Sequence, residues 1–182
     1  MPFEFKQLDI PDLILIDPRR FYDERGFFLE TYKKTEFVKA GINHNFVQDN
    51  HSLSKRNVIR GLHYQLNPKP QGKLVRVIKG KVWDVAVDIR RDSSTYLKWV
   101  GVELSEENAK MLFIPPGFAH AFAAISDDVH LAYKCTDEYD PNLDTGIRWD
   151  DPEIAIKWPV DTPIVSDKDK ELPFLKDADI FD

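Results

Sequence analysis

Two histidines stand out in the sequence because apolar, strand-like neighbours surround them. His63 lies within residues 60–65, RGLHYQ, and His120 lies within residues 115–122, PPGFAHAF. An imidazole titrates near neutral pH, so it can move a proton or ligate a metal. The alternative interpretation is two buried histidines with satisfied hydrogen bonds. The other three histidines have polar neighbours, which favours a solvated role for them: His44, His51 and His130.

Several common chemistries lack their usual signatures here. The chain has no Walker phosphate loop and no GxGxxG, which argues against nucleotide hydrolysis and standard dinucleotide binding. It also has no GxSxG nucleophile elbow. Its single cysteine, Cys135, excludes an internal disulfide framework and a four-cysteine zinc site. We expect Cys135 to be a structural thiol at a strand end.

Length and charge narrow the class of protein further. The 182 residues correspond to about one domain, and 25 basic against 31 acidic side chains give a net charge of −6. That charge argues against a general nucleic-acid binder, although an acidic protein can still hold a local basic pocket. The start shows no secretory signal, and the longest apolar stretch, residues 111–125, is shorter than the about 20 residues of a membrane helix. We expect a soluble, cytoplasmic protein with no membrane partner.

Strand signals dominate the chain. Within Val82–Ile89 the apolar residues alternate with Asp84 and Asp88, so the two sets lie on opposite faces of a strand. The run Lys73–Lys79 precedes it, and the intervening glycine predicts a hairpin between the two. A short helix is expected at residues 33–41, and a helical turn or polar loop at 105–112. The remaining predicted strands are Leu13–Ile16, Gly26–Tyr32, Val58–Gln65, Leu97–Leu104, Leu112–Ile114, Ala119–Ile125 and Leu131–Thr136.

Many short strands in one domain predict a sandwich or jelly roll, with an irregular tail from residue 150 wrapping the body. The spacing Pro115, Gly117, His120 resembles the second motif of the cupin superfamily, whose fold is a small double-stranded β-helix. In metal cupins the first motif supplies HxH and a later glutamate. Here Gln65 takes the place of the second histidine and no glutamate follows nearby. Two histidines and an amide are a poor ligand set for the catalytic metal of a cupin, so we expect no metal cofactor.

A longer, ordered set of segments is similar to the dTDP-4-dehydrorhamnose 3,5-epimerase family. It covers about residues 13–169 and consists of FYDERGFFLE from Phe21, QDNHS from Gln48, RGLHYQ from Arg60, QGKLVRV from Gln71, the PPGFAHAF run, Tyr133, Tyr139, and SDKD from Ser166. The resemblance implies a single all-β cupin jelly roll with a few short peripheral helices. It also implies a cofactor-free isomerase of dTDP-L-rhamnose synthesis, which inverts C3 and C5 of a dTDP-4-keto sugar.

The same resemblance implies catalytic roles. His63 is the base that removes a proton next to the C4 ketone, and Tyr133 is the acid that returns one from the opposite face. Lys73 stabilises the enolate that forms between these steps. A carboxylate partner for His63 maps to Asp169, and Asp84 is the local alternative for that place.

The resemblance further implies a nucleotide-binding set and a homodimer. Arginine and lysine side chains bind the diphosphate and a tyrosine stacks on thymine. N-terminal strands cross between subunits, so some members of the set serve the partner's site. The implied substrate-binding residues are Phe21, Arg25, Glu30, Gln48, Asp49, Asn50, Arg60, His120, Tyr139, Asp144 and Lys168. The competing functions are an epimerase acting at C3 only or C5 only, a metal-dependent cupin oxygenase, and a non-catalytic sugar-binding cupin.

Overall fold

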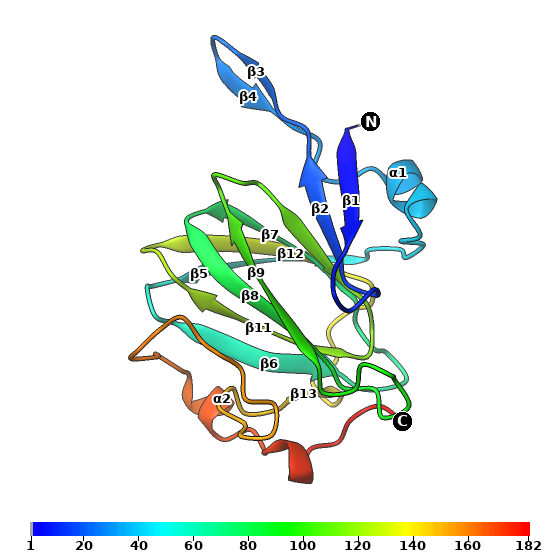
Figure 1. Ribbon diagram of the computed structural model, residues 1–182, viewed down its shortest axis with the longest axis vertical. Coiled ribbons are helices and arrows are strands. Elements are labelled where there is room, and N and C mark those ends of the chain that lie inside the picture. The colour runs from blue at the N-terminus through cyan, green and yellow to red at the C-terminus, as the bar shows by residue number, and fades with distance from the viewer. Residues whose placement is uncertain (1) are drawn as a thin grey trace.

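Two antiparallel sheets stack face to face in this computed structural model, which describes residues 2–182 (Figure 1). The six-stranded sheet has the order β1-β2-β10-β7-β12-β5, and the five-stranded sheet has the order β13-β6-β11-β8-β9. Neighbours in each sheet are mostly distant in sequence, as in a jelly roll. The prediction of an all-β, cupin-type fold with short peripheral helices is confirmed.

Most predicted strands are present, with ends shifted by one or two residues. The six-stranded sheet contains β1 (Phe3–Gln7), β2 (Ile14–Pro18), β5 (Gln48–Ser54), β7 (Lys73–Lys79), β10 (Met111–Ile114) and β12 (Val129–Cys135). The five-stranded sheet contains β6 (Ile59–Gln65), β8 (Lys81–Asp88), β9 (Trp99–Ser105), β11 (Phe118–Ala124) and β13 (Asp144–Gly146). The helices are α1 (Lys34–Lys39), α2 (Asp167–Lys170) and a 3₁₀ turn, η1 (Leu175–Asp177).

The predicted hairpin between the two central runs is wrong. β7 pairs with β10 and β12, whereas β8 pairs with β9 and β11. Gly80, at φ +83°, instead carries the chain from one sheet to the other, in a left-handed conformation that suits glycine. Both strands are central, so each pairs with two neighbours inside its own sheet and not with its neighbour in the sequence.

Three apolar clusters hold the layers together. The first fills the space between the sheets and includes Val75, Leu112 and Phe122. The second covers the outer face of the five-stranded sheet, where tail residues such as Leu175 and Phe181 pack. The third lies at the β1–β2 end of the six-stranded sheet, where α1 inserts Phe37. The barrel interior is therefore apolar at one end, which leaves the other end for polar chemistry.

A small hairpin projects from the body of the molecule (Figure 1). It consists of β3 (Phe21–Asp23) and β4 (Gly26–Phe28), and all six of its strand residues are exposed. The prediction of one longer strand from Gly26 to Tyr32 is wrong at its C-terminal end, because the pairing stops at Phe28. Among residues 2–182, no helix has the length and apolar character needed to cross a membrane.

Candidate active site

His63 sits on β6 with its side chain between the two sheets and about one third exposed. Its Nε2 lies 2.8 Å from Oδ1 of Asp169, whose side chain is almost fully buried. Nε2–H therefore donates to the carboxylate, and Nδ1 is the nitrogen left with a lone pair. Burial favours the neutral acid, but the hydrogen bonds that the carboxylate accepts from His63 and the Gly61 N–H together outweigh it and hold the pKa of Asp169 below its ordinary value.

The tail places Asp169 by local interactions. The Ser166 hydroxyl caps α2 by accepting the Asp169 backbone N–H at 3.1 Å. The second carboxylate oxygen of Asp169 accepts the Gly61 N–H at 3.1 Å. Gly61 has φ +123°, and a Cβ there would lie 2.4 Å from that of Ala121, so only glycine allows β6 and β11 to approach this closely. The capped turn is thereby attached to the strand that carries His63.

His120 forms a second histidine–carboxylate pair beside the first. It lies directly across from His63 in the β11–β6 register. Its Nε2 is 2.9 and 3.0 Å from the two oxygens of Asp84, which is fully buried on β8. Asp84 thus belongs to His120 and Asp169 to His63, which resolves the alternative that the sequence left open.

The opposite sheet supplies Tyr133 and Lys73. Strand alternation places Tyr133 on the inner face of β12, where it packs against the cluster between the sheets. Burial raises the pKa of its phenol above the ordinary value. The Lys73 Nζ lies 3.4 Å from the His63 carbonyl oxygen, and burial lowers the pKa of its ammonium. Cys135, opposite Lys73 in the register, is a buried thiol that accepts from Asn50 at 3.5 Å.

Gln65 positions the loop at the mouth of the barrel. Its amide donates to the carbonyls of Lys69 and Glu138, and its oxygen accepts the Asp140 N–H at 2.8 Å. Sequence reasoning treated Gln65 only as a missing metal ligand and did not find this structural role. The loop presents Tyr139, which is half exposed.

An ion pair between two predicted binding residues lies at the mouth of the barrel. Lys168 of α2 lies 2.7 Å from Asp144 of β13, and this hydrogen bond raises the pKa of the ammonium. The Tyr139 hydroxyl donates to the same carboxylate at 3.4 Å. The Tyr139 backbone N–H in turn donates to the Gln48 side chain at 2.8 Å. Elements from both sheets and from the tail therefore meet at this rim.

Comparisons with known proteins match this arrangement. The family model described as dTDP-4-dehydrorhamnose 3,5-epimerase matches residues 7–177. An enzyme of that name from Methanothermobacter thermautotrophicus is 50% identical over 98% of both chains. The chain belongs to the dTDP-4-dehydrorhamnose 3,5-epimerase family. It is therefore a carbohydrate epimerase, and the interpretation as a metal-dependent cupin oxygenase is not supported.

Solved structures and a more distant relative place the chain within this epimerase family. The Legionella pneumophila dTDP-6-deoxy-D-glucose-3,5-epimerase, solved with dTDP-4-keto-L-rhamnose, is 45% identical, with a TM-score of 0.94 over 97% of this chain and 95% of that one. A dTDP-4-dehydrorhamnose 3-epimerase from Streptomyces niveus is 37% identical over 95% of this chain and 84% of its own. This single-carbon epimerase is thus a relative at lower identity than the enzyme from Methanothermobacter thermautotrophicus.

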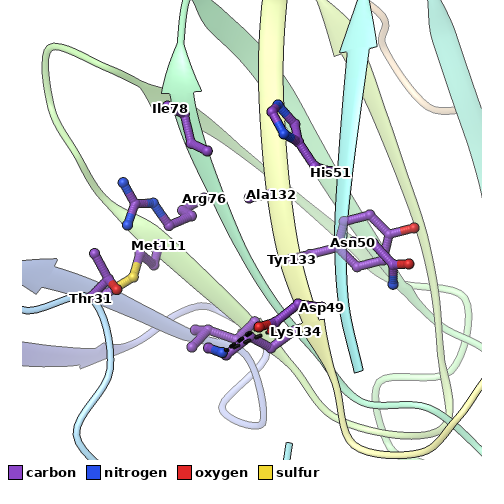
Figure 2. Close-up of a pocket in the computed structure, with 11 residues that line it drawn as sticks. Thr31, Asp49, Asn50, His51, Arg76, Ile78, Met111, Ala132, Tyr133 and Lys134 are labelled. Atoms are coloured by element: carbon purple, nitrogen blue, oxygen red, sulfur yellow. Dashed lines mark hydrogen bonds and ion pairs between the residues drawn. The ribbon is translucent and has the colours of Figure 1, made fainter. Parts of the chain in front are cut away.

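Not all of the family-implied residues lie together. His63, His120, Arg60, Gln48 and Asn50 have inward-facing positions on their strands. Asp49 alternates to the outer face of β5, where it pairs with Lys134 at 2.8 Å (Figure 2). The projecting hairpin and the segment after it carry the members that lie away from the barrel: Phe21, Arg25 and Glu30.

The outer face of the six-stranded sheet has a hollow of its own, of about 360 Å³ (Figure 2). Leu74, Ile78 and Met111 form its apolar lining, with Arg76 and His51 beside them. Asn50 and Tyr133 also border the hollow, although strand alternation directs their side chains to the other face of the sheet. Within residues 2–182, no three histidine, cysteine or acidic side chains form a group that could hold a metal ion.

Proposed function

We propose that this epimerase converts dTDP-4-dehydro-6-deoxy-D-glucose to dTDP-4-dehydro-L-rhamnose by inverting C3 and C5. The observation that carries the proposal is the His63–Asp169 pair on one sheet, facing Tyr133 on the other, in a chain about half identical to enzymes of that name. Both carbons flank the C4 ketone, so their protons are acidic enough for a positioned general base.

The first step is removal of a proton by His63. Its Nδ1 accepts the proton from carbon, and the imidazolium that results is stabilised by Asp169 at 2.8 Å. The electron pair of the broken C–H bond passes to the C4 oxygen and forms an enolate. Because Asp169 is nearly buried and accepts from both His63 and Gly61, it holds the ring in one orientation.

The enolate then needs positive charge and a proton from the far face. Lys73 supplies an ammonium inside the barrel, and His120 lies beside His63, fixed by Asp84. Tyr133 projects from the opposite sheet, so its phenol protonates carbon from the side away from His63. Burial raises the pKa of the phenol and keeps it protonated between turnovers.

The nucleotide is held at the mouth of the barrel. Arg60 and Lys168 bind the diphosphate, and Tyr139 stacks on the thymine ring. Arg60 is aimed by its hydrogen bond to Ser54 at 3.0 Å, and Lys168 by Asp144. Gln48 and Asn50 contribute side chains, and Asp49 only its backbone because its carboxylate is on the outer face.

A second copy of the chain completes the site. Phe21, Arg25 and Glu30 lie on or just after a hairpin that extends away from its own barrel, with three further aromatic rings more than half exposed. Such a hairpin is suited to reach the barrel of a partner, so the working unit is a homodimer. When an Arg25→Ala chain is mixed with a His63→Ala chain, each mixed dimer should contain one intact site of its two, so random mixing should restore up to about one quarter of the parent activity. A self-contained site would show no restoration.

Incubation with the 4-keto sugar nucleotide in heavy water tests the function directly. We expect deuterium at both C3 and C5 of the product, seen by NMR, with inversion at both carbons. Inversion at C3 alone would contradict the proposal and place the chain with the 3-epimerases, one of which is 37% identical to it. Dialysis against a strong chelator is expected to leave turnover unchanged, and loss of turnover that added iron or manganese restores would contradict the mechanism.

A further inference from the structure

Two histidines outside the catalytic site touch each other on the outer face of the six-stranded sheet. The Nε2 of His51 lies 3.0 Å from the Nδ1 of His130, and both side chains are accessible to solvent. The sequence favoured separate, solvated roles for them. We propose that this pair is a chelating site for one divalent transition-metal ion per chain, with copper(II) and nickel(II) preferred.

The distance between the facing nitrogens fits a shared ion. Imidazole nitrogens bind such ions at about 2.0–2.1 Å, so two neighbouring ligands at tetrahedral or square-planar angles lie about 2.9–3.4 Å apart. The observed 3.0 Å falls in that range. Either nitrogen can ligate, provided that each ring carries its proton on the other nitrogen. The ion would replace the single N–H···N hydrogen bond that the two rings otherwise share.

The sheet holds the two rings in place. His51 is opposite Ala132 in the β5–β12 register, and His130 is opposite Leu53, so the two histidines are diagonal neighbours on hydrogen-bonded strands. The small side chain of Ala132 leaves room beside His51. Figure 2 shows His51 at the rim of the outer-face hollow, near Ile78. Because both strands are fixed, little conformational freedom is lost when an ion binds.

The protein supplies two ligands and water supplies the rest. The acidic residues of the turn before His130 are engaged elsewhere: Asp128 pairs with Lys55, and Asp127 with Arg56. A site with two imidazoles and exchangeable water follows the usual order of affinities, in which copper(II) binds best. Hard cations such as Mg²⁺ prefer oxygen ligands and are not expected to bind.

Calorimetric titration of the tag-free chain with copper(II) and with nickel(II) tests the proposal. We expect one ion per chain, no binding of Mg²⁺, and a copper EPR spectrum with two nitrogen ligands. His130→Gln should weaken binding by about 100-fold, because the second ligand of a chelate binds at high effective concentration. His44→Gln is the matched control, since His44 packs beside the Phe113 ring and is not part of the pair.

Two results would overturn the site. Equal affinity in His130→Gln and the parent chain would assign the ion to other groups, with His63 and His120 the first to examine. Half an ion per chain would place it between two copies instead. Both variants should unfold at the parent temperature and retain epimerase activity, because neither residue belongs to the proposed catalytic or nucleotide set. This test is thus independent of the proposed function.

Discussion

The two histidine–carboxylate pairs of the barrel look alike but are built differently. Asp84 reaches His120 from the neighbouring strand, 36 residues away in sequence, and is part of the same sheet. Asp169 reaches His63 from the tail, 106 residues away, on a four-residue helix. One pair is therefore as rigid as the sheet, whereas the other depends on how the tail is seated.

This difference suits the two pairs to different roles: the His120 pair to positioning of the substrate, and the His63 pair to proton transfer. The carboxylate of Asp84, inside the sheet, holds His120 in a fixed place. A residue that binds the sugar and its developing charge needs such a fixed position. The carboxylate on α2 also lies next to Lys168, whose ammonium is at the nucleotide rim. Lys168, which we expect to bind the nucleotide, and Asp169, which orients the base His63, are therefore neighbours on the same short helix. The comparison predicts larger losses at the His63 pair than at the His120 pair.

Removal of the base should have the largest effect. His63→Ala is expected to lower carbon-proton exchange by about 10²- to 10⁴-fold, because no other group in the barrel has a free imidazole nitrogen at that place. Nucleotide affinity should persist, since Arg60 and Tyr139 are unchanged. Exchange of substrate protons with heavy water, followed by NMR, measures the first quantity, and titration with dTDP measures the second. Substantial remaining exchange would transfer the role to His120.

Removal of the acid should leave enolate formation intact but prevent the reprotonation that completes inversion. Tyr133→Phe retains His63, Lys73 and Asp169, so the enolate still forms, but inversion should fall by about 10²- to 10⁴-fold. In heavy water, deuterium should enter the unreacted sugar from the His63 side with little epimer formed. Near-normal epimerisation at both carbons would refute the assignment, and Tyr139 or a bound water would then be the candidate acid.

The two carboxylates can be compared in matched variants. Asp169→Asn should lower kcat by about 10²-fold or more, since the amide favours the wrong ring tautomer of His63 and no longer stabilises the imidazolium. Asp84→Asn should affect His120 only and cost about 10-fold, chiefly in KM. Steady-state kinetics with a thermal unfolding control distinguishes these outcomes. Equal losses in kcat would show that both pairs act in proton transfer.

The sequence predicted the fold class better than it predicted which strands pair with each other. Alternation identified the central strands, but β7 and β8 were wrongly paired because a tight turn alone does not fix which sheet a buried strand joins. β5 was missed because its sequence, QDNHSLS, is polar on both faces. Its inward positions carry Gln48, Asn50, Ser52 and Ser54, which are all polar, so the usual apolar signal is absent.

The site residues also differed in how far the sequence could identify them. Asp84 was visible from the sequence as a charge within an apolar strand, although its partner was not. Asp169 followed only from family resemblance, since nothing local distinguishes it from the other aspartates of the tail. Contacts that depend on long-range strand pairing could not be derived, and the His51–His130 pair is one of them.

The alkaline limb of the pH profile should report Lys73. Burial lowers the pKa of its ammonium, so the charge is lost as pH rises through a value below the ordinary lysine value of about 10.4. The pKa of Tyr133 is raised, so its phenol is still protonated there. As pH rises, the rate should therefore fall when Lys73 loses its proton, before Tyr133 loses its own. In Lys73→Arg the residual activity should lose this limb, and an unchanged limb would assign it to another group.

The smallest effect should come from loss of the helix cap that positions Asp169. Ser166→Ala removes the cap of α2 at a cost of about 1 kcal/mol, which is about fivefold in an equilibrium. Since Asp169 is in that helix, we expect kcat to fall, by at most about fivefold. Ser105→Ala is the matched control, because its hydroxyl also accepts a backbone N–H at 3.1 Å, from Asn108, but far from the site.

Rescue distinguishes positioning of Asp169 from a general loss of stability. Ser166→Thr keeps a hydroxyl acceptor and should recover most of the lost kcat, whereas both alanine variants should lose similar unfolding free energy. Only Ser166→Ala should slow proton removal in heavy water. If Ser105→Ala slowed it equally, the tail would act through overall stability. The orientation of His63 would then be set by the strand alone, and the two histidine–carboxylate pairs would be equally rigid.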